Sequence, residues 1–208
     1  MAEKPILFST PMVRAILDGR KTMTRRVVAD KFDPANWDWD IQDKGFGPFI
    51  EDKYGDPIEV ETLCPYGVPG DRLYVRETWT PYCINKKTCR NALLAHSNYC
   101  YKASPEECVD DLRCKWHPSI HMPKSAARIW LTVTDVRVER LQEIATDDAK
   151  AEGVLQPGVI PSNTLVRNTE GSIPRTNFKI LWDSLNASRG FSWEQNPWVW
   201  VISFEREG

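Results

Sequence analysis

The spacing of apolar residues predicts a strand and then a helix at the start of the chain. Residues 6–9 form a short apolar segment after a proline, which is typical of a buried strand. Thr10 suits a helix cap, Pro11 suits the first helical position, and the apolar residues that follow recur with the helical period. Gly19 suits the end of this helix. We expect residues 21–28 to leave it in an extended conformation.

Further strands are predicted in the middle and at the end of the chain. The clearest covers residues 127–140, where apolar and polar residues alternate. This alternation changes phase near Thr134 and Asp135, which indicates a bulge or bend. Residues 72–79 are rich in β-forming side chains, and residues 198–205 place aromatic and aliphatic side chains on one face of a final strand.

Two more helices are predicted in the second half. Thr146 caps a short helix over residues 147–152, with two acids in its first turn and Gly153 at its end. Thr176 caps an amphipathic helix. Its apolar face consists of Phe178, Leu181, Trp182 and Leu185. Because strands and helices do not alternate regularly, the pattern favours an α+β fold with a small mixed, barrel-like β-core and peripheral helices over a doubly wound sheet.

The length of 208 residues suits one domain, residues 1–208, with two insertions. Residues 29–62 are polar, acidic and rich in turn formers, and residues 81–115 are rich in cysteine. Both stretches interrupt the pattern of strands and helices, so we interpret them as insertions into the β-core.

Composition excludes several classes of protein. A hydrophobic content of 41% and a charged content of 27% are ordinary for a soluble globular protein. No apolar run approaches the roughly 20 residues that cross a bilayer. The first residues do not resemble a secretory signal, so we expect a cytoplasmic protein. The net charge of −2 argues against a protein that coats DNA.

Charge is unevenly distributed along the chain. Residues 14–26 hold five basic side chains and one acid, a balance of +4, whereas residues 33–61 hold nine acids and two lysines, a balance of −7. A basic segment beside an acidic one is compatible with a phosphate-bearing ligand at a local site, and equally with two solvated faces.

Cysteines are concentrated in the second insertion. They are Cys83, Cys89, Cys100, Cys108 and Cys114, while Cys64 lies apart. Zinc is the functional alternative for this group, but there is no C-x-x-C pair of the kind that compact zinc sites use. Free thiols are the favoured interpretation, so we predict no cofactor.

The segment from Gly19 to Arg26 holds the most chemistry. A lysine with a depressed pKa can activate a hydroxyl nucleophile, and a turn at Lys21 would bring its ammonium group beside the hydroxyl of Thr24. A helix C-terminus with stabilising cations is the alternative interpretation.

The pattern Gly19-x-Lys21-x-x-Thr24-x-Arg26 resembles the signature of ASCH domains, a PUA-like β-barrel superfamily linked to RNA. The Thr form is similar to bacterial ASCH enzymes that hydrolyse N4-acetylcytidine to cytidine and acetate. The resemblance implies that Lys21 is the proton acceptor and Thr24 the nucleophile. It also implies that Glu152, at the end of the short helix, is the proton donor.

Other blocks resemble prophage-encoded ASCH-like proteins. They are residues 64–67, 69–73, 75–79, 118–123 and 196–201, and they cover most of the chain outside the insertions. The amidohydrolases are about half as long as this chain, so they do not describe the insertions, which would widen, cover or block the pocket.

Several residues are candidates for holding the substrate. They are Arg26, Arg76, Glu77, Trp79, Ser119, His121 and Trp198. An unpaired base commonly stacks on an aromatic side chain, for which Tyr74 is a further candidate. Each candidate also suits a structural role. Glu77, beside Arg76, suits a structural ion pair, and it competes with Glu152 as the acid.

The expected ligand is a modified nucleoside or a single-stranded RNA base, with no membrane partner. Three alternatives remain open. The first is a non-catalytic RNA- or DNA-binding module, and the second is a metal-independent ribonuclease that uses Lys21. The third is a phage assembly or host-interaction protein whose insertions form the partner surface. The sequence leaves the oligomeric state open.

Overall fold

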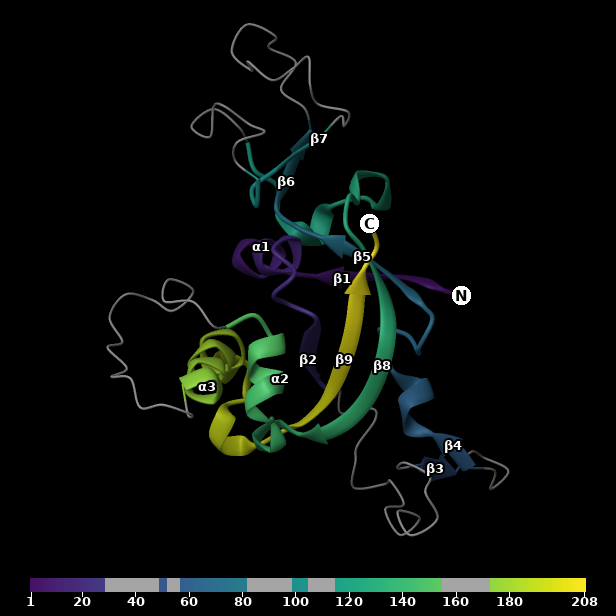
Figure 1. The fold of residues 1–208 in the computed structure, drawn as a ribbon, viewed down its shortest axis with the longest axis vertical. Coiled ribbons are helices and arrows are strands. Elements are labelled where there is room, and N and C mark those ends of the chain that lie inside the picture. The colour runs from purple at the N-terminus through teal and green to yellow at the C-terminus, as the bar shows by residue number, and fades with distance from the viewer. Residues whose placement is uncertain (29–48, 52–56, 82–98, 105–114, 155–172) are drawn as a thin grey trace, which may run out of the picture.

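The computed structural model describes residues 1–28, 49–51, 57–81, 99–104, 115–154 and 173–208. Its centre is a five-stranded sheet with the order β1-β5-β8-β9-β2 (Figure 1). These strands are β1 (Glu3–Leu7), β5 (Arg72–Arg76), β8 (Trp130–Arg140), β9 (Trp198–Arg206) and β2 (Met23–Val27). β1 and β5 are parallel, and the other neighbouring pairs are antiparallel.

The long strands β8 and β9 form the middle of the sheet. Their register shifts between Val133 and Asp135, which confirms the bulge indicated by the change of phase in the sequence. The structure differs from the prediction at β1, which runs from Glu3 through Pro5 to Leu7 instead of starting after the proline. An edge strand tolerates a proline because one side of it has no ladder to complete, and β1 lies at an edge of the sheet.

The predicted helices are present, with shifted ends. α1 (Thr10–Leu17) has Ser9 at its cap position, one residue before the predicted cap. α2 (Thr146–Ala151) has Ala145 at its cap position, one residue before the predicted cap at Thr146, and Glu152 is its C-cap. α3 (Ile173–Asn186) starts three residues earlier than the predicted cap at Thr176, because Pro174 fits the first turn of a helix, where no hydrogen bond is lost. Figure 1 shows α2 and α3 side by side next to β2 and β9.

The sheet has a hydrophobic core on each face. Trp200, Ile202 and Phe204 of β9 pack with β8 and α1, whereas Val199 and Val201 of the same strand pack with α2 and α3. The sequence predicted one buried face for β9. Both faces are covered, which explains why this strand is apolar at nearly every position.

The mixed α+β class is therefore confirmed, while the closed barrel stays a prediction. In the described strands the sheet is open, with β1 and β2 at its edges. Two small hairpins occupy parts of the predicted insertions. They are β3 (Phe49–Glu51) with β4 (Pro57–Glu59), and β6 (Trp79–Pro81) with β7 (Tyr99–Tyr101). Residues 29–48, 52–56, 82–98 and 105–114 of these insertions lie outside the described residues.

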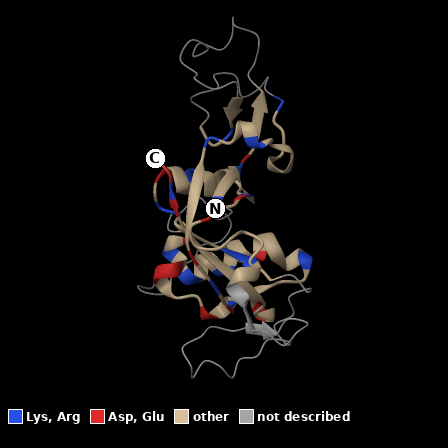
Figure 2. Cartoon of the chain, turned by 90° about the vertical axis from the view of Figure 1, so that its right-hand side faces the viewer, with Lys and Arg blue, Asp and Glu red and all other residues tan. Residues whose placement is uncertain are grey.

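Charged residues are interspersed along the described elements (Figure 2). The basic segment of residues 14–26 does not form one solvated face, because Lys21 and Arg25 are buried while Arg14 and Arg20 are not. Within the described ranges, no helix is long and apolar enough to cross a bilayer.

Candidate functional site

A tight turn connects α1 to β2 and places Lys21. The C-cap of α1 is Asp18, and Gly19 follows with a φ of 70°, a conformation that glycine adopts without strain. The backbone N–H groups of Arg20 and Lys21 then both donate to the carbonyl oxygen of Ala15, at 2.8 and 2.9 Å. The turn therefore folds Lys21 back against α1 at the start of β2.

The end of α2 meets Lys21 from the other side. Glu152 forms an isolated antiparallel bridge with Lys21, and the next residue, Gly153, has a φ of 81°. A Cβ atom at Gly153 would lie 3.0 Å from the Cβ of Ala15 and 3.1 Å from that of Lys21. The glycine that ends α2 thus also permits the close approach of three backbone segments.

Lys21 and Glu152 form a buried ion pair. The Nζ of Lys21 donates to Oε2 of Glu152 at 2.7 Å, to the carbonyl oxygen of Met23 at 2.7 Å and to that of Glu152 at 3.1 Å. The lysine side chain is 0% exposed and the glutamate side chain 4%. Burial lowers the pKa of Lys21 below its ordinary value, although the charge of Glu152 opposes this shift.

Arg25 extends this pair into a larger network. Its guanidinium group donates to Glu139, to Oδ2 of Asp148 at 2.7 Å and to Oε1 of Glu152 at 3.4 Å. We call Lys21, Arg25, Glu139, Asp148 and Glu152 the pocket cluster. These carboxylates, chiefly through the charge of Glu152, raise the pKa of Arg25 despite its burial.

Thr24 and Arg26 of β2 are in contact with each other. Nη1 of Arg26 donates to Oγ1 of Thr24 at 2.8 Å, and Nη2 donates to the carbonyl oxygen of Leu7 at 2.9 Å. The guanidinium carbon of Arg26 lies 5.2 Å from the ring centre of Phe8 and 6.0 Å from that of Tyr66. Thr24 itself is 1% exposed, and its hydroxyl accepts this hydrogen bond from Arg26.

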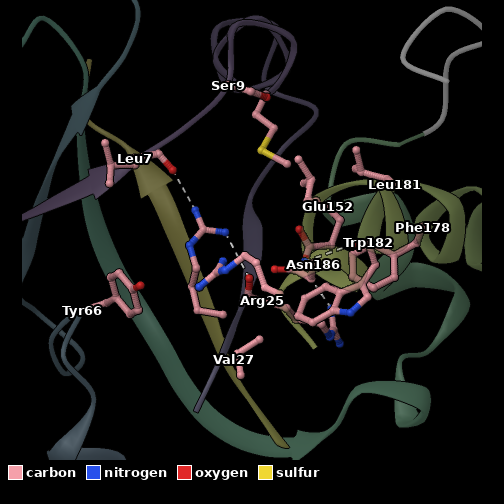
Figure 3. Close-up of a pocket in the computed structure, with 14 residues that line it drawn as sticks. Leu7, Ser9, Arg25, Val27, Tyr66, Glu152, Phe178, Leu181, Trp182 and Asn186 are labelled. Atoms are coloured by element: carbon pink, nitrogen blue, oxygen red, sulfur yellow. Dashed lines mark hydrogen bonds and ion pairs between the residues drawn. The ribbon is translucent and has the colours of Figure 1, made fainter. Parts of the chain in front are cut away.

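A pocket of 450 Å³ opens at these residues (Figure 3). It is lined by Leu7, Ser9, Met12, Arg25, Arg26, Val27, Tyr66, Glu152, Phe178, Leu181, Trp182, Leu185, Asn186 and Arg189. Figure 3 shows Arg25 between Tyr66 on one side and Phe178 and Trp182 on the other. Aromatic walls with a few buried polar groups are typical of a small-molecule site.

The structure brings some of the predicted site residues to this pocket. Arg26 and Glu152 line it. Lys21 and Thr24 do not, but each is hydrogen-bonded to a residue that does. The predicted roles of these four residues in binding or catalysis stay predictions.

The other predicted substrate-binding residues are not among those that line the pocket. Arg76 is the strand partner of Leu7, and its guanidinium group donates to the carbonyl oxygen of Ile120. Ser119 and His121 flank Ile120 in a short 3-10 helix, where His121 is exposed. This group therefore lies near the lining residue Leu7 at the ends of β1 and β5.

Two predicted aromatic candidates pack elsewhere. Trp79 is buried, with its ring 5.5 Å from that of Tyr99 and 5.4 Å from that of His117. Trp198 is half-buried, and the guanidinium carbon of Arg140 lies 4.2 Å from its ring centre.

Glu77 forms an ion pair, and its partner is Arg128 in place of the neighbouring Arg76. Nε of Arg128 donates to Oε1 of Glu77 at 2.9 Å, and Nη2 donates to Oε2 at 3.2 Å. Nη1 of Arg128 donates to the hydroxyl of Ser104, and its guanidinium carbon lies 4.0 Å from the ring centre of Tyr101. We call Glu77, Ser104, Tyr101 and Arg128 the inner cluster.

Sequence reasoning missed most of the pocket wall. The apolar face predicted for α3 does pack on the core, but its members Phe178, Leu181, Trp182 and Leu185 also line the pocket. Leu185 continues this apolar face in the sequence, and only the structure shows that it is 46% exposed at the pocket. Arg25 was also missed, because an arginine between Thr24 and Arg26 carries no local signal of burial.

The structure describes only part of the cysteine group that is the alternative zinc site. Cys83, Cys89, Cys108 and Cys114 lie outside the described residues, and Cys100 is buried in β7. Among the described residues, no group of three or more His, Cys, Asp or Glu side chains is placed to hold a metal ion. Burial raises the pKa of the Cys64 thiol to about 11.

Comparisons with known proteins do not assign a family. The sequence matches no protein-family model and no curated protein. The structure is similar to that of an ASCH domain from Lactobacillus crispatus JV V101, with a TM-score of 0.38 and 9% identity, over 99% of this chain and 79% of that one. A likeness at this TM-score adds nothing to the assignment of the site, so the resemblance to ASCH domains stays a prediction from the sequence.

Proposed function

We propose that the pocket binds a single nucleoside with a modified pyrimidine base. The observation that carries this proposal is the combination of an aromatic wall with buried, fixed charges. Tyr66, Phe178 and Trp182 offer ring faces, and Glu152, which is held by Lys21 and Arg25, offers an acceptor. Unpaired bases are bound by stacking and by hydrogen bonds to their edges. A volume of 450 Å³ suits a ligand of this size.

Titration calorimetry with cytidine, N4-acetylcytidine and adenosine tests the proposal. We expect the acetylated pyrimidine to bind most tightly. Tyr66→Leu should weaken its binding by about tenfold or more, because stacking on an aromatic ring contributes about 1–3 kcal/mol per base.

Tyr74→Leu is the matched control, since Tyr74 is also half-buried and packs on Trp130 away from the pocket lining. Equal affinity of the wild type and Tyr66→Leu, or no binding of any nucleoside by the folded wild type, would contradict the proposal.

A second function, hydrolysis of an amide on the bound base, is favoured by the state of Lys21. Lys21 and Glu152 are joined by a 2.7 Å hydrogen bond inside the protein. A proton shift along this bond gives a neutral amine and a neutral carboxylic acid, which are the forms needed for a base and an acid. Burial lowers the pKa of Lys21 and so favours the neutral amine.

In the proposed reaction, Oγ1 of Thr24 attacks the carbonyl carbon of the acetyl group while Lys21 accepts the hydroxyl proton. Glu152 donates a proton to the departing exocyclic amine, so the C–N bond breaks and an acetyl ester of Thr24 forms. Water then hydrolyses the ester, releases acetate and restores the protons. Because Thr24 is 1% exposed and bonded to Arg26, the Arg26 side chain must move aside when substrate enters.

Release of cytidine from N4-acetylcytidine, followed by chromatography, tests the hydrolysis. Thr24→Val keeps the shape of the side chain and removes its hydroxyl, so we expect turnover to be abolished. Thr24→Ser keeps the hydroxyl and should retain turnover. Binding of N4-acetylcytidine without turnover by the folded wild type would leave the protein as a binding module, and degradation of RNA that persists in Lys21→Ala would place any nuclease centre elsewhere.

A further inference from the structure

The charges that line the pocket are not all neutralised by neighbouring carboxylates. Arg25 is paired with Glu139 and Asp148, and Glu152 is paired with Lys21. The remaining charged lining residues are Arg26 and Arg189. Among the described residues, no carboxylate forms an ion pair with either arginine. The pocket therefore presents positive charge to its contents, which favours an anion.

Arg189 is the more available of these two arginines. Arg26 is already hydrogen-bonded to Thr24 and to the carbonyl oxygen of Leu7. Arg189 is exposed, and within the described part of the chain no group accepts a hydrogen bond from its guanidinium. Its donors are therefore free to bind a ligand at the edge of the pocket.

The position of Arg189 relates it to the aromatic wall. It ends the short 3-10 helix Ala187–Arg189, which directly follows α3. Leu181, Trp182, Leu185 and Arg189 all line the pocket. Leu185 follows Leu181 by four residues and Arg189 follows Leu185 by four, a spacing that places the three on one side of this helical segment. A nucleoside stacked on the wall formed by α3 would thus share the pocket with the guanidinium group of Arg189.

We propose that the pocket binds a nucleoside monophosphate in preference to the nucleoside, with Arg189 as the residue that binds the phosphate. This inference rests on the proposed function and names its substrate class. A guanidinium group binds phosphate through two parallel hydrogen bonds, and one free arginine suits one phosphate group. An RNA strand would need a series of phosphate contacts, so the mononucleotide is the better match.

Calorimetry with N4-acetylcytidine and N4-acetylcytidine 5′-monophosphate tests the inference on the full chain. The wild type should bind the monophosphate about tenfold more tightly than the nucleoside, as expected for a charge-assisted hydrogen bond. This difference should shrink when the salt is raised from about 0.05 M to about 0.5 M, because ions screen an exposed pair.

The decisive variant is Arg189→Gln, which should abolish the preference for the monophosphate over the nucleoside. Arg175→Gln is the matched control, because Arg175 is also exposed, lies on α3 and does not line the pocket. Its preference for the monophosphate should equal that of the wild type. Unchanged thermal melting of Arg189→Gln would confirm that the loss does not come from unfolding.

Each other outcome overturns the inference in a distinguishable way. If the wild type binds both ligands equally, the phosphate has no site, while the proposed function stands. If Arg175→Gln and Arg189→Gln weaken monophosphate binding equally, the effect is a general one of net charge. Tighter binding of a tetracytidylate than of the monophosphate, lost in Arg189→Gln, would identify an RNA strand as the ligand. If neither ligand binds, the proposed function and the inference both fail.

Discussion

The pocket cluster and the inner cluster are both built from buried ion pairs, but they use burial differently. In the inner cluster, Arg128 binds both oxygens of Glu77 and stacks on Tyr101. In the pocket cluster, Glu152 is shared by Lys21 and Arg25, and two of its members line a cavity. In the inner cluster one arginine binds both oxygens of one glutamate, whereas the pocket cluster holds charges at the edge of a pocket.

This difference shows why burial of charge is not by itself evidence of function. A buried pair with good geometry offsets the free-energy cost of removing its charges from water. Removing one partner lowers the free energy of unfolding strongly, because the other charge stays buried without that counter-ion. Arg128 holds both oxygens of Glu77, whereas Lys21 and Arg25 each hold one oxygen of Glu152, so removing Arg128 breaks more hydrogen bonds to a single carboxylate. We therefore expect the inner cluster to matter most for stability and the pocket cluster to matter most for binding and chemistry.

Arg128→Met should have the largest effect on stability. It leaves Glu77, which is 1% exposed, without this guanidinium, so the free energy of unfolding should fall by about 4 kcal/mol. Urea denaturation measures the change. Arg72→Met is the control, because Arg72 also stacks on an aromatic ring but forms its ion pairs at the surface, so its loss should be much smaller. Equal losses in the two variants would contradict the expectation that a buried ion pair matters more for stability than ion pairs at the surface.

Gly153→Ala should be the next most damaging change. It combines a left-handed backbone with the close approach of Ala15 and Lys21, and we expect a loss of about 3 kcal/mol. Gly190→Ala is the matched control at the end of another helical segment. Gly190 has a φ of 88° but no atom near its missing Cβ, so about 1 kcal/mol should be lost. Thermal or urea unfolding of both variants isolates the contribution of close packing around Lys21.

Lys21→Met should cost less stability than Arg128→Met although Lys21 is the more deeply buried cation. Arg25 stays 3.4 Å from Glu152 in this variant, so the carboxylate keeps a counter-ion and the loss should be about 2 kcal/mol. The same variant should lose any hydrolytic turnover. A loss of stability as large as that of Arg128→Met would show that Arg25 does not support Glu152.

The smallest predicted effect is a dependence of stability on pH. Burial lowers the pKa of Lys21 in the folded protein below the ordinary value of 10.5 that the unfolded chain retains. Between these two values the unfolded chain binds the additional proton, so raising the pH stabilises the fold.

The measurement is the difference in unfolding free energy between the wild type and Lys21→Met as a function of pH. This difference should rise toward pH 10.5 by at most about 1.4 kcal/mol per pH unit and then level off. A difference that stays constant or falls as the pH rises would contradict the lowered pKa.

Most of the elements could be predicted because their signals are local. Alternation and its change of phase identified β8 and its bulge, and helix-ending glycines marked the ends of α1 and α2. Errors occurred where position in the sheet decided the outcome. The proline within β1 is acceptable because that strand lies at an edge, and β9 has two buried faces because helices cover the side opposite α1.

The site was predictable only in part. The basic segment indicated Lys21, Thr24 and Arg26, and the end of the short helix indicated Glu152, but none of these residues indicates its partners. The contact of Lys21 with Glu152 spans 131 positions of the chain, and that of Arg25 with Asp148 spans 123. The same limit applies to Glu77, whose partner Arg128 is 51 positions away while the neighbouring Arg76 is directed to Ile120.

The sequence by itself determined the helices and strands and the lysine and threonine available for chemistry, because propensity, capping and periodicity act over a few residues. Only the tertiary structure decided that Lys21 meets a carboxylate away from water, that Thr24 lies under Arg26, and that one face of α3 serves both as core and as pocket wall. The physical reason is that burial and charge pairing depend on which distant segments pack together, and these two factors set the pKa of Lys21 and leave Arg189 free to bind a ligand.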